Sequence, residues 1–257
     1  MFSFDLIYII ICLVGGILAG IASGMIGLGG GVIFIPVLLN ILPLTGFTEP
    51  SPLTTIATSL FAGVFSSGSS SYFHSRSGNI HLKEGISLAG GAVAGSISAS
   101  LFASGVDEVF LHYFIAAILV FVVIYLNFGK ERIKLDVKRR NIFLPLTGII
   151  MGAISALSGI GGGVLFLPVL AVVFAQNIKW AVGTSSFVVF ITLLTGTVSY
   201  IAINGNGIVD YYTGILLAIG AITGARFGVL FLKKIEQSVI IKLFSLFLII
   251  NIIIIVF

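Results

Sequence analysis

A glycine-rich motif that occurs twice holds the residues best suited to bind a ligand. Its first copy is Gly27-Leu-Gly-Gly-Gly-Val-Ile-Phe-Ile-Pro-Val-Leu38, and its second is Gly159-Ile-Gly-Gly-Gly-Val-Leu-Phe-Leu-Pro-Val-Leu170. Consecutive glycines form a poor helix because each costs about 1 kcal/mol relative to alanine. Proline, in contrast, is favoured in the first turn of a helix. The motif therefore predicts an unwound glycine segment followed by a helix that starts near Val32 and again near Val164.

An unwound segment of this kind can bind an anion. The first N–H groups of a helix have no partner within it, and the helix dipole favours negative charge at that end. Glycine adds no functional group of its own, but it lets main-chain amides approach a ligand closely. Close helix packing is the alternative reading of these glycines. The backbone groups expected to bind the substrate are those of Gly29, Gly30, Gly31, Val32, Gly161, Gly162, Gly163 and Val164.

Hydroxyl groups follow each copy of the motif at matching places. Thr58 and Ser59 in the first half align with Thr184 and Ser185 in the second. A hydroxyl can donate to an anion without bringing a charge, and it can also bond to a carbonyl of its own helix. We include these four residues in the substrate site. The serine-rich run 66–71 is interpreted as a closely packed or water-lined helix face.

Charged residues are scarce inside the predicted spans. Arg226 is the one strong cation within such a span, so we include it as a substrate ligand, with snorkelling to the nearby membrane surface as the alternative. None of the nine acidic residues lies near the middle of a span, which leaves no carboxylate for a sodium site or a proton relay. The motifs HExxH and GxSxG are absent, and the single cysteine, Cys12, lies in an apolar run. We therefore expect no enzyme, no cofactor and no bound metal.

The elements that position these residues are apolar segments of membrane length. Of the 257 residues, 58% are hydrophobic and 9% are charged, whereas a soluble domain has about 25% charged residues. This composition excludes a soluble enzyme or a nucleic-acid-binding protein. A membrane-spanning helix needs about 20 apolar residues. Apolar stretches occur at residues 4–23, 32–44, 53–72, 85–103, 109–128, 142–157, 164–175, 180–203, 211–232 and 239–257.

The repeated motif divides the chain into two transmembrane repeats, residues 1–128 and 142–257, joined by a basic linker at 129–141. The short stretches 32–44 and 164–175 reach only about 20 Å as helices, so the unwound glycines must complete each crossing. Basic loops face the cytoplasm. With the linker in the cytoplasm, five crossings in each half bring all the basic loop residues to that side and both termini to the periplasm.

An odd number of crossings gives the two halves opposite orientations in the membrane. The predicted fold class is therefore an all-α polytopic membrane protein with two inverted-topology repeats of about five crossings each. Its helices are broken at the glycine motifs. The two copies of the motif then approach one site from opposite sides of the bilayer.

The glycine motif with its proline, the Thr–Ser pairs, the turn Gly78-Asn-Ile80 and the basic linker together resemble the sulfite exporter TauE/SafE family of membrane transporters. The resemblance spans nearly the whole chain and is most specific at residues 27–38 and 159–170. It implies transport of small sulfur-containing anions, such as sulfite or an organosulfonate, across the bacterial inner membrane. We expect a secondary transporter that works by alternating access; a passive anion channel is the alternative. The expected partners are a small anionic substrate and the lipid bilayer, without nucleic acid, and a homo-oligomer is left open.

Overall fold

The computed structural model describes residues 2–44, 50–102, 137–159 and 161–236, together with single positions at 120, 124, 239, 242, 246 and 249. Apart from these single positions, the predicted spans 109–128 and 239–257 fall outside the described residues, as does most of the linker 129–141. Every regular element within the described ranges is helical. The elements are α1 (Phe2–Ile26), α2 (Gly31–Pro36), η1 (Val37–Ile41), α3 (Leu42–Leu44), α4 (Pro52–Arg76), α5 (Leu82–Phe102), α7 (Val137–Ser158), α8 (Gly163–Pro168), η3 (Val169–Val173), α9 (Ile178–Asn204), η4 (Asn206–Ile208) and α10 (Tyr211–Lys234).

The helices are interrupted at both glycine motifs, as the sequence predicts. The glycines adopt the left-handed conformation that side chains disfavour, with φ of 76°, 81° and 94° at Gly27, Gly29 and Gly30. The corresponding glycines of the second copy also have positive φ. Each short helix then begins at the last glycine of its motif, one residue before the predicted start.

The prolines of the motif lie later in the helix than predicted. Pro36 is the last residue of α2 and Pro168 the last of α8, in the second turn rather than the first. A π-helical segment, η1 or η3, follows directly after each proline. Proline has no N–H and its ring crowds the carbonyl one turn earlier, which disturbs the regular hydrogen-bond ladder. Both prolines therefore mark the start of a π-helical turn.

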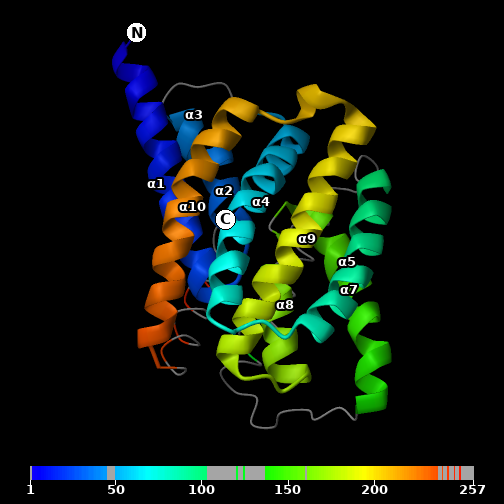
Figure 1. Ribbon diagram of the computed structural model, residues 1–257. Helices are drawn as coiled ribbons and strands as arrows, with labels where there is room; N and C mark the ends of the chain where they lie inside the picture. The colour runs from blue at the N-terminus through cyan, green and yellow to red at the C-terminus, as the bar shows by residue number, and fades with distance from the viewer. Residues whose placement is uncertain are drawn as a thin grey trace.

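Helices from distant parts of the chain pack side by side. In Figure 1, α1 lies against α10 at one side, α4 and α9 lie in the centre, and α5 packs against α7 at the other side. Glycines spaced four residues apart, such as Gly16 and Gly20 on α1 and Gly148 and Gly152 on α7, lie in these contacts. A Cβ added at Gly20 would lie 2.2 Å from the carbonyl oxygen of Ala221, and one at Gly152 2.2 Å from that of Ala92. These glycines serve helix packing, as their spacing predicts.

The helical bundle has the exterior of a multi-pass membrane protein. Four described helices are long and apolar enough to cross a membrane, at residues 6–26, 82–102, 178–204 and 211–234. Outward-facing Ile86 and Val198 are 61% and 58% exposed. The serine-rich helix α4 does not meet the same criterion, and it is packed among α1, α9 and α10. Its polar face is thereby kept from the surroundings.

Candidate anion site

Each glycine turn places a left-handed glycine at the start of a short helix. Gly30 precedes α2 with φ 94° and ψ −16°, and Gly162 precedes α8 with φ 63° and ψ −16°. The carbonyl of Gly30 accepts from the amides of Ile33 and Phe34 at 2.9 and 3.1 Å. This pairing closes the first helical turn and leaves the preceding amides to find partners elsewhere.

Several of the predicted anion-binding amides have no hydrogen-bond partner among the described residues. In the part of the chain that the structure describes, the amides of Gly31, Val32 and Val164 donate to no acceptor. The second turn differs, because the amide of Gly163 donates to the carbonyl of Gly161 at 2.7 Å. All these residues are buried. Buried amides without partners are uncommon in proteins, and a bound anion would satisfy them.

The two glycine turns touch each other. A Cβ added at Gly161 would lie 3.1 Å from the carbonyl oxygen of Leu28, and one at Gly163 would lie 2.3 Å from that of Gly27. Such an approach of one backbone to another is open to glycine alone. The structure thus brings together the two motifs, which lie 132 positions apart in the printed sequence.

The serines of the Thr–Ser pairs fasten each turn to the opposite half. The Ser59 hydroxyl donates to the carbonyl of Gly159 at 2.9 Å, and the Ser185 hydroxyl donates to the carbonyl of Gly27 at 3.1 Å. Each acceptor is the first glycine of the other copy of the motif. These two hydroxyl protons are therefore engaged in holding the turns, and their contact with an anion stays a prediction.

The threonines of the same pairs contact the segments that join the long helices, namely the α9–α10 turn and the α4–α5 turn. The Thr58 hydroxyl oxygen accepts from the amide of Asp210 at 2.9 Å, and the Thr184 oxygen accepts from the amide of His81 at 3.0 Å. Each threonine keeps its own proton for a further acceptor. A role for Thr58 and Thr184 in anion binding also stays a prediction.

Arg226 is not joined to the glycine turns. Its side chain is exposed on α10, next to Phe227, which is 53% exposed. Within the described residues it makes no hydrogen bond or ion pair. This exposure fits the alternative in which the side chain runs along the lipid to the membrane surface. Its place in the substrate site stays a prediction.

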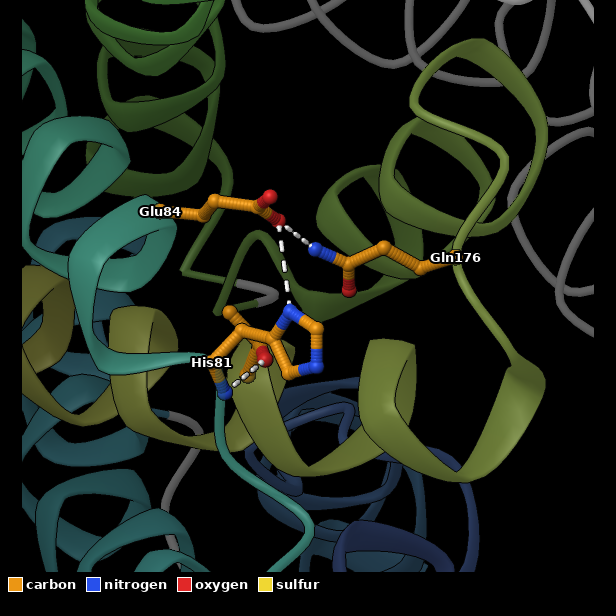
Figure 2. A network of polar contacts seen from close by, with 4 residues as sticks. His81, Glu84 and Gln176 are labelled. Atoms are coloured by element: carbon orange, nitrogen blue, oxygen red, sulfur yellow. Dashed lines mark hydrogen bonds and ion pairs between the residues drawn. The ribbon is translucent and has the colours of Figure 1, made fainter.

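Polar clusters lie at the two turns that join long helices. Figure 2 shows the first, at the start of α5, where the Gln176 amide donates to the Glu84 carboxylate and His81 Nδ1 lies 3.9 Å from the same oxygen. The second lies at the start of α10, where Asp210 accepts from the amide of Thr213 at 3.1 Å and also from its hydroxyl. The α4–α5 turn lies at the lower end of the bundle and the α9–α10 turn at the upper end (Figure 1).

Three further serines have hydroxyls that sequence reasoning did not assign to the site. The Oγ atoms of Ser23, Ser66 and Ser155 are buried and have no hydrogen-bond partner among the described residues. Ser66 was placed on a packed or water-lined face by its sequence context. The sequence could have indicated the other two as site residues, because Ser23 and Ser155 lie four residues before the first glycine of each motif.

Comparison with known proteins identifies a family of membrane transporters. The model of the family described as "Sulfite exporter TauE/SafE" matches residues 12–255. The probable membrane transporter protein YunE of Bacillus subtilis is 27% identical over 93% of this chain and 94% of its own length. A probable membrane transporter protein of Haemophilus influenzae is 29% identical over 95% and 96% of the two chains, and YdhB of B. subtilis, named likewise, is 30% identical over 87% and 90%. No solved structure matches the chain. The family match covers nearly the whole sequence, and the chain therefore belongs to the sulfite exporter TauE/SafE family of membrane transporters.

Proposed function

We propose that this protein is a secondary transporter that carries a small sulfur oxyanion or sulfonate across the bacterial inner membrane by alternating access. The observation that supports this most is the meeting of two buried glycine turns, at which the amides of Gly31, Val32 and Val164 have no partner within the described residues. Such donors suit an anion with several acceptor oxygens. The family description names sulfite, which is an anion of this kind.

The proposal includes an inverted repeat made of residues 1–128 and 142–257, with the linker 129–141 in the cytoplasm and both termini in the periplasm. Equivalent residues of the two halves make equivalent contacts, which supports this arrangement: Ser59 with Gly159 corresponds to Ser185 with Gly27. The α4–α5 and α9–α10 turns also lie at opposite ends of the bundle (Figure 1). Opposite placement of equivalent turns is what an inverted repeat requires.

In this arrangement the two polar clusters close the two ends of the transport path. The Glu84–Gln176 contact joins α5 of the first half to the segment before α9 of the second. At the other end, Thr213 on α10 contacts the hydroxyl of Tyr8 on α1. An anion at the glycine turns would reach the cytoplasm when the first cluster separates and the periplasm when the second does.

A passive anion channel is the second candidate. It is favoured by the absence of acidic side chains from the glycine turns in the described ranges, because such side chains are the usual ligands of a coupling cation. A channel and a carrier differ in flux. Only a carrier saturates and exchanges substrate across the membrane.

Substrate-dependent stabilisation tests the binding part of the proposal. Purified protein would be heated with sulfite, sulfate, thiosulfate, sulfoacetate or taurine, with chloride at matched ionic strength as the control. A bound anion at about 100 times its Kd stabilises the folded state by about 2.7 kcal/mol. We expect at least one sulfur oxyanion or sulfonate to raise the melting temperature above the chloride control. If none did, the proposed substrate class of sulfur oxyanions and sulfonates would be wrong.

A further inference from the structure

We propose that the hydroxyls of Ser66 and Ser155 donate hydrogen bonds to the anion, one from each half of the protein. This inference rests on the proposed function and deepens it. It names side-chain ligands of the same site that differ from those expected from the Thr–Ser pairs.

The first observation is that both hydroxyls lack a partner although they are fully buried. Ser66 and Ser155 are each 0% exposed, and neither Oγ atom has a hydrogen-bond partner in the described part of the chain. A buried hydroxyl without a partner destabilises the fold, and native proteins keep few of them. A bound ligand would account for both.

The second observation is that each serine lies on a helix where an internal acceptor is normally available. Serines in helices commonly donate to the carbonyl four residues earlier. Ser67, directly beside Ser66, does so to Gly63 at 2.6 Å, and Ser70 donates to Ser23 of α1 at 3.0 Å. Ser66 makes no such bond, so its hydroxyl is oriented away from the default acceptor of its own helix.

The third observation is the direction in which the two hydroxyls lie. Ser66 Oγ is 3.2 Å from the position that a Cβ on Gly30 would take, and Ser155 Oγ is 3.1 Å from the corresponding position on Gly162. These are the two left-handed glycines that precede the short helices. Ser66 therefore faces the turn before the unpartnered amides of Gly31 and Val32, and Ser155 faces the turn before the unpartnered amide of Val164.

The helices that follow these turns are long enough to orient the amides at their first residues. The helical path that starts at Gly31 continues through η1 and α3 to Leu44, and the one that starts at Gly163 continues through η3 to Val173. A phenyl ring packs against the same glycine at each turn, with Phe34 2.8 Å from the Cβ position of Gly30 and Phe166 2.8 Å from that of Gly162. The ligand set is thus made of neutral donors in an apolar surrounding.

These neutral donors favour one class of ligand. It suits an oxyanion with at least three acceptor oxygens, because amides of two turns and two hydroxyls can then be satisfied together. Ser66 belongs to α4 in the first half and Ser155 to α7 in the second. The anion therefore bridges both halves, and its release requires both hydroxyls to lose their acceptor.

The test compares Ser66→Ala and Ser155→Ala with Ser67→Ala, a neighbouring buried serine whose hydroxyl is bonded within its own helix. Sulfite binding would be titrated by calorimetry, and the melting temperature would be measured without sulfite. We expect Ser66→Ala and Ser155→Ala each to raise the sulfite Kd by about 10- to 150-fold, the range for a hydrogen bond to a charged group. Without sulfite their melting temperatures should equal or exceed that of the unmodified protein, since no bond is lost. Ser67→Ala should keep the Kd within about 3-fold.

Two results would overturn the inference and leave the proposed function standing. One is sulfite binding by both variants with the unmodified Kd; the other is a lowered melting temperature without sulfite, which would mean that the hydroxyls serve the fold. If Ser66→Ala did not yield monodisperse protein, Ser66→Cys would replace it, since a thiol is a weak donor of similar size. An unmodified protein that bound no sulfur anion would overturn the proposed function itself.

Discussion

At the scale of single residues, the glycine turns leave no space for side chains. Gly30 has a φ of 94°, and a Cβ there would lie 2.8 Å from the ring of Phe34. We expect Gly30→Val and Gly162→Val to abolish anion binding, because a branched side chain would displace the turn and its amides. Sulfite-dependent thermal stabilisation of variants purified as monodisperse protein measures this. Binding at the unmodified affinity would mean that the motif is structural only.

The serines of the Thr–Ser pairs lead to a different expectation. Ser59 and Ser185 each donate to a buried glycine carbonyl of the other half. Replacing either with alanine should lower the free energy of unfolding by about 1–3 kcal/mol, since the carbonyl loses its partner. Melting in detergent without anion provides the measurement. An unchanged melting temperature in both variants would contradict the role of Ser59 and Ser185 in holding the glycine turns.

The sequence predicts the glycine turns but not the protein partners of the serine hydroxyls. Gly27 to Gly31 form a turn because of their own conformational freedom, which is a local property. The partner of Ser59 is Gly159, 100 residues away, and it depends on which helices become neighbours. The unpartnered state of Ser66 and Ser155 depends on packing in the same way. Such contacts cannot be derived from spacing in one sequence.

At the scale of helices, two adjacent glycines on α5 allow the effect of helix packing on stability to be measured apart from the effect of helix propensity. A Cβ at Gly91 would lie 2.0 Å from the carbonyl oxygen of Pro145 on α7, whereas one at Gly90 would meet nothing within 4 Å. We expect Gly91→Ala to destabilise the protein by about 1–3 kcal/mol through overpacking. Gly90→Ala should stabilise it by about 0.5–1 kcal/mol, because alanine favours the helix. Equal melting temperatures for the two variants would contradict the α5–α7 contact.

Most helix positions follow from apolar periodicity and length, and the deviations have local causes. The stretch 180–203 corresponds to α9 at Ile178–Asn204, whose start is fixed by Asn177 accepting from the amide of Lys179. The π-helical segments after Pro36 and Pro168 were not predicted, since they arise from the missing proline N–H inside a continuing helix. The start of α7 at Val137 lies within the predicted linker, because basic residues can extend a helix beyond its apolar part.

At the scale of the whole molecule, the proposed topology can be tested at one exposed residue near each end of the bundle. Cys12, the single cysteine of the sequence, would first be replaced with alanine. Ser75→Cys and Asn206→Cys then place one thiol near each end of the bundle. We expect a membrane-impermeant maleimide added outside spheroplasts to label only Asn206→Cys, and inverted vesicles to give the opposite pattern. Labelling of both from one side would exclude the inverted repeat.

Counterflow in proteoliposomes distinguishes a carrier from a channel. Vesicles loaded with unlabelled sulfite would be diluted into a trace of radioactive sulfite, with Gly30→Val protein and empty vesicles as controls. A carrier exchanges bound substrate across the membrane, so we expect transient accumulation of label above equilibrium and saturation of the flux with rising sulfite. Both should be lost in the Gly30→Val protein. Flux that rises linearly with concentration and shows no accumulation of label would contradict alternating access and identify a channel.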